Sequence, residues 1–274
     1  MSLQLQHVTK DFGGLRAVSD VTFEVPERSI FGLIGPNGAG KTTVFNLITG
    51  VYEPNAGTIR LGDVDLGRLR PAHVARAGVA RTFQNIRLFG QLTVLENLLV
   101  ACELQKRSHL LGALLRLPVH YADERSMTKR ALELLDVFGL THMAHTPSTS
   151  LPYGHQRRLE IARAMMIAPK VLLLDEPAAG MNSLEAAGLS DQIRWLRDTF
   201  RVTVLLVEHN MQVVMDVCEE IHVLDHGETI AQGSPDEVRD NAIVVAAYLG
   251  EEDVNSVPSS MLQPLPSIRG GQLR

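Results

Sequence analysis

Lys41 stands directly after a glycine-rich run and directly before two threonines, and the whole stretch fits the pattern G-x-x-x-x-G-K-[ST]. Glycines let the backbone curl so that successive N–H groups point into one concavity, and a helix that starts there adds partial positive charge. Such a loop binds phosphate groups, with the Lys41 ammonium at the β- and γ-phosphates and the Thr42 hydroxyl as a ligand for Mg²⁺. A glycine-rich turn with a chance lysine is the alternative, which the complete pattern disfavours. The loop comprises Gly35, Pro36, Asn37, Gly38, Ala39, Gly40, Lys41, Thr42 and Thr43.

Two acids, Asp175 and Glu176, end an apolar run that is typical of a buried strand. Ligands of open α/β sheets bind at the carboxyl ends of the strands. We therefore predict that Asp175 holds Mg²⁺ through water and that Glu176 polarises or deprotonates the attacking water. A solvated turn is the alternative for such an acidic pair, and the nearby phosphate loop disfavours it.

Two further polar residues follow strand patterns. His209 directly follows the run Val204–Glu208, where it is placed to sense the γ-phosphate or to orient the water. A histidine after a strand is also a common structural hydrogen-bonder, but the constellation favours a functional role. Gln84 follows the run VARTF and is placed to bind Mg²⁺ through its side-chain oxygen, with a surface glutamine at a loop start as the alternative.

The elements that must position these residues follow from hydrophobic patterning. Residues 3–25 alternate apolar and polar side chains twice, which predicts two antiparallel strands around the turn DFGG. A helix is predicted over 41–50, ended by Gly50. Strands alternating with helical stretches predict an α/β domain with a parallel sheet. Strand patterns occur at residues 29–35, 57–63, 171–176, 202–208 and 220–227.

The middle of the chain is predicted to be helical. Residues 92–104 and 123–140 carry helical patterns, with an apolar, leucine-rich segment between them. We therefore expect a helical subdomain at about 85–165, inserted in an α/β core. The apolar residues of the second helix are Met127, Ala131, Leu134, Leu135 and Phe138.

Composition narrows the class of protein. The chain has 274 residues, 45% of them hydrophobic, and a formal charge of −5, which argues against a nucleic-acid-binding role. Cys102 and Cys218 lack metal-ligand spacing and indicate a reduced compartment. We expect no signal peptide and no membrane span, because no apolar run approaches the ~18 residues that a span requires. Residues 1–250 are expected to form one domain, and 251–274 a tail without fixed structure.

These motifs, in this order, resemble those of the ATP-binding cassette (ABC) family over residues 3–250. The resemblance assigns the phosphate loop to Walker A, Gln84 to the Q-loop, LPYGH to the signature, VLLLDE to Walker B, AAGMN to the D-loop and His209 to the switch histidine. It implies a P-loop NTPase core with an N-terminal antiparallel β region. It also implies that Phe12 stacks on adenine, whereas a core phenylalanine is the alternative.

The stretches FGGLRAV, RTFQNIRLF, YGHQRRLEIARA, DEPAAGMN and AAYLGEE resemble the ATP-binding subunit of branched-chain amino acid importers. That resemblance implies an ATPase that uses ATP and Mg²⁺ to power solute uptake at the cytoplasmic face of the plasma membrane. The implied partners are a second ATP-binding cassette, two transmembrane permease subunits and an extracytoplasmic solute-binding protein. The leucine-rich stretch at 110–117 is expected to be core or part of the docking surface.

The signature departs from the family pattern. The usual serine is Pro152, which has neither a hydroxyl nor an N–H to offer a phosphate. We expect Tyr153, Gly154 and His155 still to contact nucleotide through the Gly154 N–H and a helix that starts near His155. Fewer donors at this signature predict an asymmetric pair of ATP sites, unless the proline only fixes the loop. The usual D-loop acid is Asn182, which keeps hydrogen bonding and loses the charge.

Other functions remain open at this point. Subgroup relatives serve other small polar solutes such as urea and amides. An ABC ATPase of translation or DNA repair usually has two cassettes in one chain or a long coiled coil, and this chain shows neither pattern. A nucleotide-binding module that does not hydrolyse is supported by Pro152 and opposed by Glu176 and His209.

Overall fold

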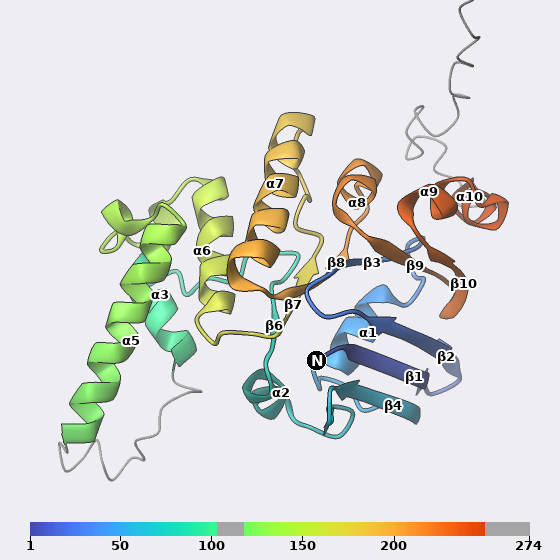
Figure 1. Cartoon of the computed structure of the whole chain (residues 1–274), viewed down its shortest axis with the longest axis horizontal. Coiled ribbons are helices and arrows are strands. Elements are labelled where there is room, and N and C mark those ends of the chain that lie inside the picture. The colour runs from blue at the N-terminus through green and yellow to red at the C-terminus, as the bar shows by residue number, and fades with distance from the viewer. Residues whose placement is uncertain (103–117, 250–274) are drawn as a thin grey trace, which may run out of the picture.

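The computed structural model describes residues 1–102 and 118–249. The predicted tail and most of the leucine-rich segment lie outside this part of the chain. The described elements form two sheets with helices around them, and a group of helices at one end (Figure 1).

The first sheet is antiparallel and has the strand order β2-β1-β4-β5. Its strands are β1 (Leu3–Phe12), β2 (Leu15–Val25), β4 (Ala56–Leu61) and β5 (Val64–Asp65). The β1–β2 hairpin turns at Gly13, where φ is +58°, a value that glycine adopts at no steric cost. The hairpin predicted around DFGG is confirmed.

The second sheet has the order β10-β9-β3-β8-β7-β6. Strands β6, β7, β8, β3 and β9 run parallel and β10 runs antiparallel to β9, so the carboxyl ends of the parallel strands share one edge. The bounds are β3 (Ile30–Ile34), β6 (Val79–Arg81), β7 (Val171–Asp175), β8 (Thr203–Val207), β9 (Glu220–Asp225) and β10 (Glu228–Gly233).

Helices cover both faces of this parallel sheet, which is why its central strands are buried throughout. Helix α1 (Lys41–Ile48) lies between the two sheets (Figure 1), where it packs with Leu33, Leu173 and Leu205. The opposite face, with Leu172 and Leu174, packs against α7 (Ser183–Phe200) and α8 (Met211–Val217). The remaining helices around the sheets are α2 (Pro71–Ala77), α9 (Pro235–Arg239) and α10 (Ala242–Leu249).

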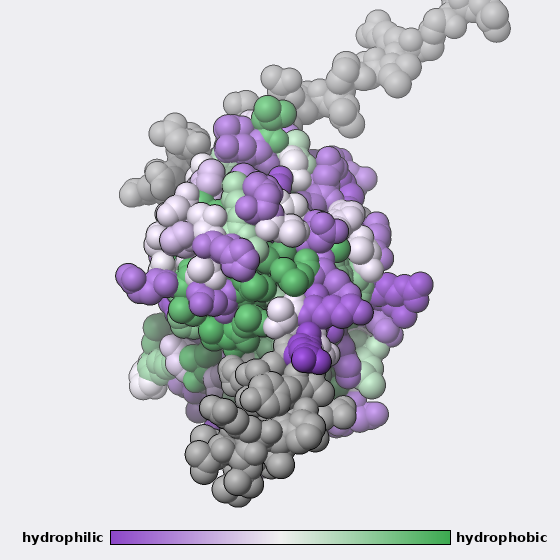
Figure 2. Space-filling model, turned by 90° about the vertical axis from the view of Figure 1, so that its left-hand side faces the viewer, coloured by the Kyte–Doolittle hydropathy of each residue, from purple (hydrophilic) through white to green (hydrophobic). Residues whose placement is uncertain are grey.

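Helices α3 (Val94–Ala101), α5 (Pro118–Val137) and α6 (Tyr153–Met165) form the group at the end of the molecule, with short 3₁₀ turns at Thr141–Met143 and Ser148–Ser150. Seen from that end, apolar side chains gather in the middle of the face, with polar side chains around them (Figure 2). The helical patterns are confirmed, and α6 begins at Tyr153, close to the predicted start near His155. Among the described helices, none has the length and apolar character needed to cross a membrane.

Candidate functional site

The glycine-rich loop joins β3 to α1 and folds as a tight cup. Gly35 has φ of +148° and a Cβ there would lie 2.0 Å from the Leu224 carbonyl oxygen. Gly40 has φ of +99° and a Cβ there would lie 2.6 Å from the Ala17 carbonyl oxygen. Both positions therefore require glycine. The Lys41 Nζ donates to the carbonyl oxygens of Gly35 at 2.6 Å and Pro36 at 2.7 Å, so the ammonium lies inside the cup.

A cleft of about 440 Å³ opens over this loop. Phe12 lines the cleft, is 39% exposed and meets the ring of Tyr52 edge-on at 5.0 Å. Phe12 is therefore an exposed aromatic at the cleft and not a core residue. Other lining residues outside the loop are Leu15, Arg16, Ala17, Glu176, His209 and His226.

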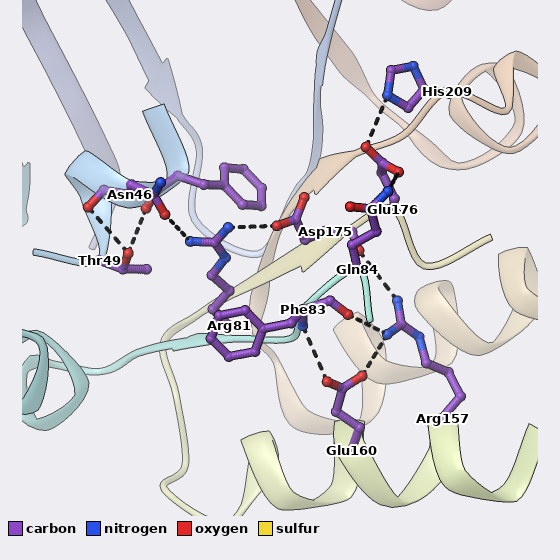
Figure 3. A network of polar contacts seen from close by, with 11 residues as sticks. Asn46, Thr49, Arg81, Phe83, Gln84, Arg157, Glu160, Asp175, Glu176 and His209 are labelled. Carbon is purple, nitrogen blue, oxygen red and sulfur yellow. Dashed lines mark hydrogen bonds and ion pairs between the residues drawn. The ribbon is translucent and has the colours of Figure 1, made fainter. Parts of the chain in front are cut away.

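Glu176 contacts two of the other predicted residues, Gln84 and His209 (Figure 3). The Gln84 Nε2 donates to Glu176 Oε2 at 2.5 Å, and the His209 Nε2 lies 3.0 Å from Glu176 Oε1. Glu176 has φ of +46°, a backbone conformation that is sterically unfavourable for a residue with a Cβ and that clusters at functional sites. The Gln84 amide, which the sequence left between a ligand and a surface role, thus contacts the carboxylate expected to act on water.

Asp175 has a partner that the sequence analysis missed. The Arg81 Nη2 donates to Asp175 Oδ2 at 2.6 Å, and its Nη1 donates to Asn46 Oδ1 at 2.7 Å. The Arg81 guanidinium lies 5.3 Å from the Phe45 ring and 5.2 Å from the Phe83 ring, and its side chain is 9% exposed. Arg81 therefore fixes the orientation of the Asp175 carboxylate (Figure 3). The one sign of this contact in the sequence was an arginine within a short apolar strand pattern.

Glu208, which precedes His209, was missed as well. Its Oε1 accepts from the Ala178 N–H at 2.5 Å, and its Oε2 accepts from the N–H groups of His209 and Asn210, each at 2.8 Å. Burial raises the pKa of the Glu208 carboxyl, against the opposing effect of these backbone hydrogen bonds. Glu208 thus joins the loop that carries His209 to the loop after β7.

Of the predicted signature residues, Tyr153 and Gly154 line a different cleft, of about 560 Å³, with Pro152, Arg158 and Glu185. His155 does not line this cleft, and its Nδ1 is buried without a hydrogen-bond partner. Pro152 and Tyr153 are exposed there, and Tyr153 is 53% exposed. Pro152 is the N-cap of α6, and no side chain caps this helix. The signature stretch therefore does not join the phosphate loop of the same chain in one cleft.

Asn182, the residue in place of the usual D-loop acid, is the N-cap of α7. Its side-chain oxygen accepts from the N–H groups of Leu184 and Glu185, each at 3.0 Å, and the Glu185 carboxylate accepts from the Asn182 N–H. The reciprocal pair is a capping box. Asn182 therefore has a structural role that the sequence analysis did not predict.

Comparison with known proteins extends these observations. Residues 18–179 match the ABC transporter family model, and residues 228–254 match the model of the branched-chain amino acid ATP-binding cassette transporter. The chain is 46% identical to the high-affinity branched-chain amino acid transport ATP-binding protein BraF of Pseudomonas aeruginosa, covering 91% of this chain and 98% of the relative. It is 47% identical to LivG of Escherichia coli, a protein of the same description, covering 88% of this chain and 94% of the relative.

Solved structures agree with the sequence relatives. An ATP-binding cassette of an ABC transporter, in its ADP conformation, superposes with a TM-score of 0.79 at 30% identity, covering 92% of this chain and 100% of that one. A dimeric cassette in a post-hydrolysis state, bound to ADP and phosphate, superposes with a TM-score of 0.69 at 26% identity, covering 85% and 98%. The P-loop fold expected from the motifs is confirmed, and the chain belongs to the ABC transporter family as one of its ATP-binding cassettes.

Proposed function

We propose that this cassette powers the uptake of branched-chain amino acids or related small polar solutes at the cytoplasmic face of a membrane. The observation that carries the proposal is the contact of Glu176 with both Gln84 and His209, beside the phosphate loop of a chain that resembles BraF and LivG. An ATP-binding module that does not hydrolyse would have no need of this arrangement.

Each residue has a distinct role in hydrolysis. The N–H groups of the loop and the Lys41 ammonium bind the phosphates and stabilise the charge on the transferring phosphoryl group. Glu176 orients and polarises the attacking water, and His209 holds the carboxylate in place. Phe12 stacks on the adenine ring at the mouth of the cleft.

Thr42, Asp175 and Gln84 are the proposed ligands for Mg²⁺. A hydroxyl, a carboxylate and an amide oxygen are the hard donors that this ion prefers, and Mg²⁺ commonly keeps several waters beside one or two protein carboxylates. When bound, the ion neutralises charge on the β- and γ-phosphates.

The separate signature cleft supports pairing with a second cassette. Because Tyr153 and Gly154 do not reach the phosphate loop of their own chain, we infer that they contact ATP held by the partner's loop. Two permease subunits and a solute-binding protein complete the proposed assembly. The apolar area at the helical end (Figure 2) is the proposed docking face for a permease subunit.

A second candidate is an export system, because the chain is also 36% identical to the lipopolysaccharide export ATP-binding protein LptB of Escherichia coli, over 92% of this chain.

Uptake of labelled leucine, urea and related solutes distinguishes the candidates. Cells with the complete transporter and Lys41→Ala should lose uptake of the true substrate, since the phosphates lose their main cation. Lys170→Ala, whose exposed side chain lies outside both clefts, should retain it. Equal uptake with and without Lys41→Ala for every solute would contradict import.

A further inference from the structure

Helix α6 carries a buried ion pair that the roles above do not use. The Arg157 Nη1 lies 2.6 Å from Glu160 Oε2, and the side chains are 3% and 1% exposed. Removing two charges from water is costly, and apolar residues of similar size would often stabilise a core as well or better. The contacts of the two side chains should therefore explain why this costly pair is buried here.

Both side chains contact the backbone of Phe83, directly before Gln84 (Figure 3), and the Arg157 Nη2 also lies 3.5 Å from the Asp175 carbonyl oxygen. The Arg157 Nη1 donates to the Phe83 carbonyl oxygen at 2.8 Å. The Glu160 Oε1 accepts from the N–H groups of Phe83 at 3.3 Å and Arg87 at 3.4 Å. The pair thus holds the segment 83–87 through its main chain, without depending on the exposed Gln84 side chain itself.

The same helix reaches both functional clefts. Its first turn, with Tyr153 and Gly154, lines the signature cleft, and Arg157 lines that cleft as well. One turn further along, the pair holds the backbone from which the Gln84 amide reaches Glu176. The two charged side chains therefore join the first turn of α6 to the backbone that carries Gln84.

We propose that Arg157 and Glu160 are positioning residues that set the place of Gln84 against Glu176 and link it to the signature end of α6. The inference rests on the proposed function, because it gives Gln84 a role in hydrolysis. The pair acts when the first turn of α6 meets the nucleotide held by a partner cassette: α6 moves, the segment 83–87 follows, and the Gln84–Glu176 contact changes.

A kinetic double-mutant cycle on the full-length chain tests this link. Arg157→Met should lower kcat for Mg·ATP at least about tenfold, which corresponds to about 1.4 kcal/mol of transition-state stabilisation. The KM for ATP should change less than about twofold, because the phosphate loop is untouched. In a Gln84→Ala background, the same substitution should lower kcat less than about twofold further. Arg157→Lys should recover part of the rate, because lysine keeps the charge and loses the two-armed geometry.

Equal losses in both backgrounds would overturn the proposal, because Arg157 would then act independently of Gln84. If Arg157→Met does not fold, Glu160→Gln serves the same cycle, since the amide keeps the size of the side chain and removes the charge that orients Arg157 toward the Phe83 carbonyl oxygen. The matched control is Arg163→Met, on the same helix above the Phe89 ring, which should leave kcat within about twofold. A wild-type chain that does not hydrolyse Mg·ATP removes the proposed function and this link together, whereas an active chain with equal losses removes only the link.

Discussion

At the scale of single residues, the site is organised around carboxylates that are held by long side chains. Glu176 is held by Gln84 and His209, and Asp175 is held by Arg81 (Figure 3). A carboxylate that must meet water or a metal at a fixed angle benefits from such contacts, because they are already in place before the substrate binds.

Arg81→Met tests the hold on Asp175. Removing one partner of a buried ion pair leaves an uncompensated charge, so the free energy of unfolding should fall by about 3–5 kcal/mol. Arg87→Met is the matched control, because Arg87 lies 4.4 Å from the same Phe83 ring and is exposed to solvent. The control should change stability by less than about 0.5 kcal/mol. Denaturant unfolding curves for both variants give the comparison, and equal values would show that Arg81 does not hold Asp175.

At the scale of elements, the beginning of α6 differs most from the family pattern. Pro152 is the N-cap with φ of −54° and ψ of 150°, which a serine also adopts, and no side chain caps the helix. Serine would add a cap and a phosphate donor, while losing the rigidity of proline. These effects on folding oppose each other at about 1 kcal/mol each, so stability should change little.

Pro152→Ser should therefore raise ATP hydrolysis in the assembled transporter without a large change in stability. A restored donor contributes on the order of 1–3 kcal/mol, and the site that gains it is the one with the partner's phosphate loop. The control is Pro147→Ser, at the start of the 3₁₀ turn Ser148–Ser150 and outside the signature cleft. If the hydrolysis rate and the apparent ATP affinity both stay unchanged, Pro152 only fixes the loop.

At the scale of the whole molecule, the features that depend on a short run of residues could be predicted from the sequence, whereas the long-range contacts could not. The phosphate loop and the ends of β7 and β8 were predictable, because a short run of residues fixes each of them. The contacts of Arg81 with Asp175 and of Arg157 with Phe83 join residues 94 and 74 positions apart, so no local period signals them.

The predicted helical subdomain at 85–165 remains a prediction. The described helices of that range pack into the same apolar cluster as β7, β8 and α7, including Leu98, Phe138, Leu159 and Leu174. The ring of Phe138 also meets that of Trp195 on α7 at 5.7 Å. These contacts set how firmly the helical end is attached to the sheets.

The roles assigned to the site require that the loop at 35–43 binds a triphosphate and that Glu176 promotes its cleavage by water. The most direct measurement is release of phosphate from Mg·ATP by the purified chain and by Glu176→Gln, together with equilibrium binding of ATP to both. We expect Glu176→Gln to bind ATP as tightly as the wild type and to release phosphate at least about a hundredfold more slowly, since the amide cannot accept the proton of the attacking water. Equal rates of phosphate release by the two proteins would contradict it.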